Sequence, residues 1–181
     1  MEIVKAVYMQ EQYVKLAINI VLMTFALASD IRTYKIKNRL VSIFIVIGIA
    51  INVVLKGKEG IGFSLIGMVV PIVVLFLLYY LKMLGAGDIK LFAAIGAIMG
   101  VKFILYAMVY SFLAGGMIAL FIMLVRKNAL QRFKYFTHYI KACMLSISLL
   151  PYNEFEDKAN NGKFPFAYAI FCGTVYVFVV V

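Results

Sequence analysis

Two of the eight acidic residues stand at the edges of apolar stretches and are the strongest candidates for chemistry in this chain. Asp30 directly follows an apolar stretch that ends at Ser29, and Asp88 directly precedes another that begins at Ile89. A carboxylate in such a place is costly to keep and marks a candidate functional site. The other six acids lie in polar segments, where a solvated surface charge is expected: Glu2, Glu11, Glu59, Glu154, Glu156 and Asp157.

Two neighbouring carboxylates can hydrolyse a peptide bond. When they share one site they cannot easily both ionise, so one of them keeps its proton. The ionised partner can then activate water, while the protonated partner polarises the carbonyl of the substrate. Gly85 and Gly87, just before Asp88, would let an extended peptide approach the backbone closely. We expect the flanking Lys82 and Lys90 to favour an ionised Asp88, and a neighbouring carboxylate to oppose it.

A structural role for each aspartate is the competing interpretation. Arg32 or Lys90 can neutralise an aspartate at a helix end, and Asp88 can act as an N-cap that binds free amides of the following helix. Spacing alone does not show that the two carboxylates meet. The single histidine, His138, and two widely separated cysteines form no metal-ligand pattern. We therefore expect no metal and no cofactor.

The composition places these aspartates in a membrane protein. Of the 181 residues, 65% are apolar and 14% are charged, whereas soluble domains have about half apolar and about a quarter charged residues. The excess apolar surface must face lipid, so the lipid bilayer is an expected partner. The net charge of +10 would suggest nucleic acid for a soluble protein. Basic residues beside apolar spans instead follow the positive-inside rule, and we expect no nucleic-acid partner.

The apolar residues form six runs, which predict an all-α, polytopic transmembrane helix bundle of about six spans. We expect residues 1–181 to form a single membrane-embedded domain, with no N-terminal domain that contains cysteines. Gly60 is expected in an external loop, where a larger side chain should have a mild effect. The six runs are Tyr13–Ser29, Leu40–Leu55, Ile61–Leu81, Ile89–Val101, Phe103–Val125 and Phe164–Val181.

The fourth run is too short to cross a membrane alone. Its 13 residues correspond to about 20 Å of helix, against a hydrocarbon layer of about 30 Å. We expect one of its ends to lie inside the membrane plane, shielded by other helices. A further apolar stretch, Ala142–Leu150, follows a basic segment with interleaved aromatic residues. It is either an amphipathic piece on the membrane surface or a packed loop, and both interpretations stay open.

The basic residues predict the orientation of the chain. Thirteen of the eighteen Lys and Arg fall in or beside three segments on one side: Asp30–Arg39, Lys82–Asp88 and Arg126–Lys163. Because cytoplasmic loops carry the excess of Lys and Arg, we expect this side to be cytoplasmic and the N-terminus to be outside. Both aspartates then lie at the same, cytoplasmic membrane face.

Three stretches resemble the type IV prepilin peptidases, which are intramembrane aspartyl proteases of the GxGD class. Ser29-Asp30-Ile31-Arg32, followed by Ile36-Lys37-Asn38, resembles the first aspartate motif of that family. Gly85-Ala86-Gly87-Asp88-Ile89-Lys90-Leu91 resembles the second motif, and Phe164-Pro165-Phe166-Ala167 resembles the opening of the last helix. The family often has proline where Lys37 and Tyr168 stand here. Neither departure touches a carboxylate.

The resemblance implies an aspartic-type endopeptidase of the inner (plasma) membrane, with Asp30 and Asp88 as the catalytic pair. It implies cleavage of the basic leader of prepilins or pilin-like secretion proteins at the cytoplasmic face. The larger members also methylate the product through a domain with paired cysteines, so this chain resembles the short, peptidase-only forms. The residues expected to bind substrate or to shape the loops are Gly85, Gly87, Lys90 and Pro165.

Two other interpretations remain. Presenilin-like and preflagellin-processing enzymes share the GxGD motif. Presenilin-type enzymes also carry a Pro-Ala-Leu signature, and this chain has Pro165-Phe166-Ala167 instead. The second interpretation is a small membrane transporter or assembly component in which Asp30 and Asp88 carry protons or ions. Such a protein would hold its acids near the middle of the bilayer and often contains internal repeats, neither of which is evident here.

Overall fold

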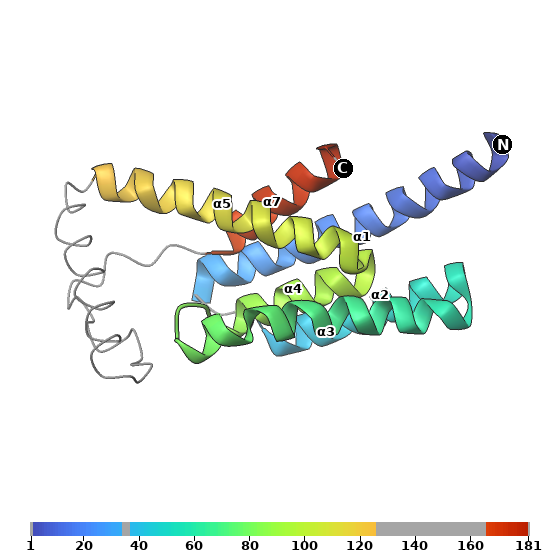
Figure 1. Cartoon of the computed structure of the whole chain (residues 1–181), viewed down its shortest axis with the longest axis horizontal. Helices are drawn as coiled ribbons and strands as arrows, with labels where there is room; N and C mark the ends of the chain where they lie inside the picture. Colours follow the sequence, from blue (N-terminus) through green and yellow to red (C-terminus); the bar gives the residue numbers. More distant parts are fainter. Residues whose placement is uncertain (1, 34–36, 126–165, 181) are drawn as a thin grey trace.

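The computed structural model describes residues 2–33, 37–125 and 166–180, and these residues form helices and short turns with no strand. The expected all-α helix bundle is thereby confirmed (Figure 1). Every one of the six apolar runs corresponds to a helix. The helices are α1 (Glu2–Thr33), α2 (Asn38–Lys56), α3 (Lys58–Tyr80), α4 (Ala86–Met99), α5 (Val101–Val125) and α7 (Ala167–Val180).

Within the described residues, four helices are long and apolar enough to cross a membrane. They contain the segments Met9–Ile31, Asn38–Lys56, Lys58–Tyr80 and Val101–Ile122. The first helix is longer than its apolar run, because the polar N-terminal segment continues the same helix for 32 residues in all. α4 and α7 have 14 residues each, about 21 Å of helix, and are too short to cross unaided. Ala142–Leu150 lies outside the described residues.

α4 is the central helix of the bundle, and its sequence suits that place. Every residue from Leu91 to Gly100 is buried, and the helix contacts α1, α2, α3 and α5. Small residues let neighbouring helices approach it closely. A side chain on Gly96 would collide with the backbone oxygen of Gly67 in α3, and one on Gly67 would collide with the oxygen of Gly96. Close approach through small residues is a common way for helices to associate in membranes.

α4 ends among other helices, as its short apolar run predicts. The last carbonyl groups of a helix have no partner within the helix and need one elsewhere. Asn52 of α2 supplies it, because its buried amide nitrogen lies 3.0 Å from the oxygen of Ala97 and 3.1 Å from that of Ile98. The same nitrogen lies 2.9 Å from the hydroxyl oxygen of Ser64 in α3. One polar side chain therefore joins three helices where the chain turns into α5.

The expectation for Gly60 is wrong. α3 begins at Lys58, directly after a turn at Gly57 with a positive φ of 61°. Gly60 is therefore a buried residue of the first turn of α3, and a Cβ there would collide with the carbonyl group of Asn52. The polar residues around Gly60 suggested a longer loop, but one glycine with a positive φ, Gly57, is enough to reverse the chain.

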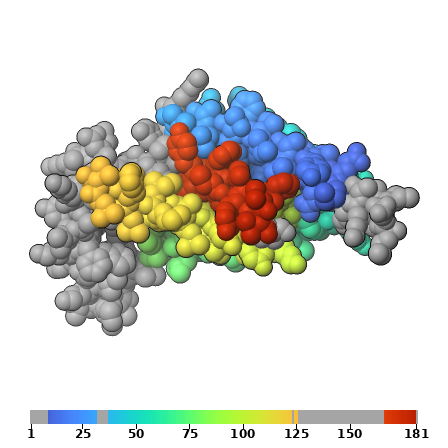
Figure 2. Space-filling view, turned by 90° about the horizontal axis from the view of Figure 1, so that it is seen from above, coloured from blue at the N-terminus to red at the C-terminus, as the bar shows by residue number. Residues whose placement is uncertain are grey.

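α7 packs along α5, and Figure 2 shows it lying between α1 and α5 on one face of the molecule. A Cβ at Gly173 would lie 2.5 Å from the backbone nitrogen of Ser111, so these two helices are in backbone contact there. Nearer the start of α7, the ring of Phe166 would lie 2.7 Å from a Cβ at Gly115. The small residues of α5 thus set the position at which α7 begins.

Candidate active site

Asp30 joins the end of α1 to the beginning of α7. Its carboxylate is buried, with 7% of the residue exposed, and one oxygen accepts a hydrogen bond of 3.3 Å from the backbone N–H of Ala167. Ala167 is the first residue of α7, where amide groups lack partners within the helix. A helix N-terminus carries a partial positive charge and favours an anion beside it. The carboxylate of Asp30 therefore interacts directly with the N-terminus of α7.

Asp88 lies in the first turn of α4, but it is not the N-cap. That position is held by Gly85, which has an extended backbone, and Asp88 is the third residue of the helix. The Asp88 carboxylate interacts with the backbone N–H of Gly85, as the third residue does in a capping box. A Cβ on Gly85 would lie only 3.0 Å from the Asp88 carboxylate oxygen. The glycine therefore leaves room for the carboxylate.

The two carboxylates act on each other electrostatically. Asp88 lies outside the four membrane-length helices, and its pKa is raised from 3.8 to about 6. Burial is the largest cause, the charge of Asp30 is the second, and the amide of Gly85 opposes both. Loss of hydration and a nearby like charge each disfavour the ionised form of an acid. The arrangement thus favours the protonated form of Asp88.

The expected effect of Lys82 and Lys90 on Asp88 is not observed. Neither lysine is among the groups that shift its pKa, and the shift is upward. Lys90 instead donates a hydrogen bond of 3.0 Å to the side-chain oxygen of Asn38, the first residue of α2. Lys90 therefore connects α4 to the start of α2.

A row of aromatic rings sets the distance between α4 and the start of α7. The ring of Phe92, one turn after Asp88, lies 6.3 Å from that of Phe112 in α5. The ring of Phe112 lies 5.8 Å from that of Phe166, which directly precedes α7. Aromatic pairs at these distances are favourable beyond the area that they bury. The row brings the amide that binds Asp30 and the turn that carries Asp88 to the same end of the bundle.

The structure brings together most, but not all, of the residues expected at the site. Asp30 acts electrostatically on Asp88, Gly85 lies beside the Asp88 carboxylate, and Gly87 lies half-buried within the same turn. Pro165 lies outside the described residues. Sequence reasoning missed the amide of Ala167, although the Phe164–Ala167 stretch had been singled out. A backbone donor has no side-chain signature, so only its place at the start of an apolar helix could have indicated it.

Both carboxylates lie near the end of a helix. Asp30 is one residue from the end of the membrane-length segment Met9–Ile31, and Asp88 is in the first turn of α4. Acids that carry ions through a transporter are expected near the middle of the bilayer. The described geometry is instead that of two carboxylates at one end of a helix bundle.

Comparison with known proteins identifies a family for this chain. The family model described as "Type IV leader peptidase family" matches residues 17–120, more than half of the chain. The match includes both aspartates and the Gly85–Asp88 turn, and it ends before α7. Searches of curated proteins and of solved structures find no match. With its membrane-length helices, the chain belongs to the type IV leader peptidase family.

Proposed function

We propose that the protein is an intramembrane aspartyl endopeptidase that removes the basic leader from type IV prepilins or pilin-like secretion proteins. The observation that carries the proposal is the pairing of Asp30 with Asp88, in which Ala167 binds one carboxylate and the other has a raised pKa. The family match supports a leader peptidase. The substrate class and the cleavage at the cytoplasmic face go beyond that match and are part of the proposal.

The two carboxylates have different surroundings, and we assign them different roles. Asp30, at the N-terminus of α7, is the base, because its carboxylate accepts a hydrogen bond from the amide of Ala167 and lies beside the positive end of the helix dipole. Asp88 is the acid, because burial and the Asp30 charge raise its pKa to about 6. Pairs of titratable groups whose surroundings push their protonation apart are typical of acid and base partners.

The reaction needs only water and this pair. Asp30 takes a proton from water as the oxygen of that water bonds to the scissile carbonyl carbon, and Asp88 donates its proton to the carbonyl oxygen. The tetrahedral species then collapses. Asp88 recovers the proton from oxygen, Asp30 delivers its proton to the amide nitrogen, and the C–N bond breaks. One water is consumed, and both carboxyl groups return to their starting states.

The turn before Asp88 is the proposed seat of the scissile segment. A helical substrate must unwind locally before its carbonyl is open to attack, and its freed amides and carbonyls then need partners other than lipid. Gly85 is exposed and Gly87 is half-buried, so an extended strand can lie beside this backbone. A site at the rim of the bundle also gives the unwound segment access to water.

A cleavage assay with a co-expressed pilin-like substrate tests the proposal. Asp30→Asn and Asp88→Asn should each abolish cleavage while membrane insertion is retained, because each removes one half of the pair. Glu59→Gln, an exposed acid in the first turn of α3, is the matched control and should cleave normally. Substantial activity in either aspartate variant would refute the mechanism.

The same assay tests whether cleavage occurs without methylation. Mass spectrometry of the mature product should show a free, unmethylated N-terminus when this protein is the only processing enzyme present. A methylated terminus in that background would reveal a methyl-transfer site in this chain and would contradict the proposed peptidase-only activity.

A further inference from the structure

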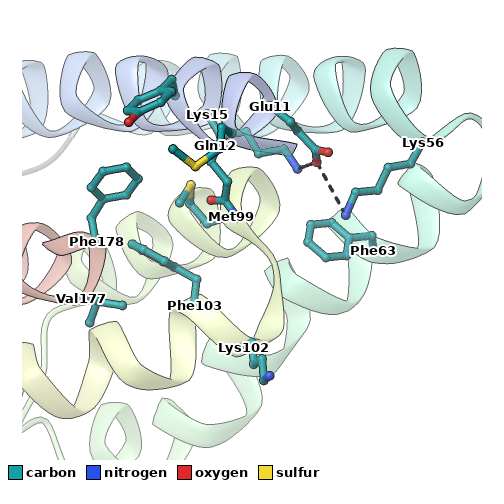
Figure 3. A pocket seen from close by; sticks show the side chains of 12 residues that line it. Glu11, Gln12, Lys15, Lys56, Phe63, Met99, Lys102, Phe103, Val177 and Phe178 are labelled. Atoms are coloured by element: carbon teal, nitrogen blue, oxygen red, sulfur yellow. Dashed lines mark hydrogen bonds and ion pairs between the residues drawn. The ribbon is translucent and has the colours of Figure 1, made fainter. Parts of the chain in front are cut away.

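A large pocket lies at the end of the bundle opposite to the aspartate pair. Its volume is about 640 Å³, and residues from α1, α2, α3, α4, α5 and α7 line it (Figure 3). Glu11, in its wall, precedes Asp30 by 19 residues on the same continuous helix, which is about 28 Å. That separation is close to the thickness of the hydrocarbon layer. The pocket therefore faces the second membrane surface.

The pocket carries an excess of positive charge. Three lysines and one glutamate line it, which leaves a net charge of +2. Lys15 is only 4% exposed and donates a hydrogen bond to Glu11, and the ammonium of Lys56 lies 3.7 Å from the same carboxylate oxygen. One carboxylate thus faces two ammonium groups, as Figure 3 shows. Lys102, from the first turn of α5, adds an exposed third.

The remaining wall of the pocket is apolar. It includes Met99 from the end of α4, Phe103 from α5, and Val177 and Phe178 from α7. The ring of Phe63 lies under Lys56, with the ammonium 3.7 Å from its centroid. A simple anion would satisfy the lysines but would make no use of these apolar side chains. An amphiphile with an anionic head and hydrocarbon tails matches both parts of the lining.

We propose that this pocket binds the phosphate headgroup of an anionic phospholipid from the membrane leaflet opposite to the aspartate pair. Lys56 and Lys102 would contact the phosphate, while Glu11 holds Lys15 in place. The acyl chains would lie along Phe103 and Phe178. A lipid in this position would join the start of α1 to α5 and α7, and would stabilise the bundle where α1 has few partners. The inference does not depend on the peptidase activity.

Lipid titration of the purified full-length protein in neutral detergent tests the proposal. Phosphatidylglycerol should raise the melting temperature and should appear as one retained molecule in native mass spectrometry. Phosphatidylcholine with the same acyl chains should be retained roughly tenfold less, because it has no net charge. Soluble glycerol 3-phosphate at equal concentration should have no effect, since it makes no contact with the apolar wall.

Lys56 and Lys58, on either side of the turn between α2 and α3, provide a matched pair of variants. Lys56→Gln should lower the affinity for phosphatidylglycerol about tenfold, as expected for loss of one charge-assisted contact. Lys102→Gln should act in the same direction. Lys58→Gln, two residues from Lys56 but outside the pocket, should leave the affinity unchanged. Equal losses at Lys56 and Lys58, equal retention of both lipids, or stabilisation by glycerol phosphate would each overturn the proposal.

Discussion

The carboxyl group of Asp88 is the most perturbed group of the candidate site, and its environment sets a pH dependence. Its pKa is raised to about 6 by burial and by Asp30. If Asp88 is the acid, cleavage requires that Asp88 still holds its proton. Activity should therefore decline as the pH rises through about 6.

The pH profile of leader cleavage, measured on purified protein and a pilin-like peptide, checks this expectation. Glu59→Gln should keep the same profile, since that acid lies at the other end of α3. A rate that stays constant from pH 5 to pH 8 would show that no proton on Asp88 is needed.

The same pKa shift predicts a cost in stability. The folded protein binds the Asp88 proton more tightly than the unfolded chain does, because its pKa rises from 3.8 to about 6 on folding. The free energy of unfolding should thus fall as the pH rises from about 4 to 6 and remain lower above that range. The upper limit of the loss is about 3 kcal/mol for two pKa units. Asp88→Asn has no charge at this position and should not show this pH-dependent loss of stability.

Thermal unfolding of wild type and Asp88→Asn at two pH values provides the measurement. The variant should be more stable than wild type at pH 8 and should show little advantage at pH 4. An advantage of the same size at both pH values would mean that the asparagine acts through packing alone and that the charge of Asp88 is not destabilising.

Gly85 should be needed for activity more than for folding. A Cβ there would lie 3.0 Å from the Asp88 carboxylate oxygen, so Gly85→Ala should displace that carboxylate and lower cleavage at least tenfold. The position is exposed, and the amount of folded protein should change little. Gly62→Ala in α3 is the control, because nothing lies within 4 Å of a Cβ there. Normal activity of Gly85→Ala would argue against this placement of Asp88.

At the scale of the helix, the contact between α3 and α4 depends on two glycines. A Cβ on Gly67 would collide with the backbone oxygen of Gly96, so Gly67→Ala must push the two helices apart. We expect a loss of roughly 1–3 kcal/mol or more in the free energy of unfolding, the range of overpacked sites. Cleavage should fall with it, because α4 carries Asp88.

Gly116→Ala in α5 separates this steric effect from helix propensity. That position is open, and alanine is a better helix former than glycine by about 1 kcal/mol. The control should therefore be neutral or slightly stabilising in thermal unfolding. A similar melting temperature for Gly67→Ala and wild type would contradict the close contact between α3 and α4.

The sequence predicted the helices much better than their contacts. The run Leu40–Leu55 became the helix Asn38–Lys56, because apolar length and flanking charges determine where such a helix begins and ends. The partners of Asn52 were not foreseen, although a buried amide in an apolar run signals a polar contact between helices. Lys90 was assigned to Asp88 because the two are close in sequence, whereas the structure shows a hydrogen bond to Asn38, 52 residues away.

At the scale of the whole molecule, the proposed orientation remains to be tested by labelling. Lys58 and Lys82 stand near opposite ends of α3, and the excess of basic residues puts the Lys82 side in the cytoplasm. In a variant without Cys143 and Cys172, an impermeant thiol reagent on intact cells should label a cysteine at position 58. A cysteine at position 82 should be labelled only after the cells are opened. The reverse pattern would place both aspartates on the outer face.

The hydrogen bond between Asp30 and Ala167 also has a consequence for biosynthesis. Its two partners are 137 residues apart, so the ribosome finishes α1 long before it makes the amide that Asp30 binds. Ala167 follows Asp88 by 79 residues, which take roughly 4–16 s to synthesise at the usual rate of about 5–20 residues per second. During that interval both carboxylates are already in the nascent chain while the helix that orients Asp30 is missing. A newly made molecule should therefore be unable to cut its neighbours until its last helix is in place.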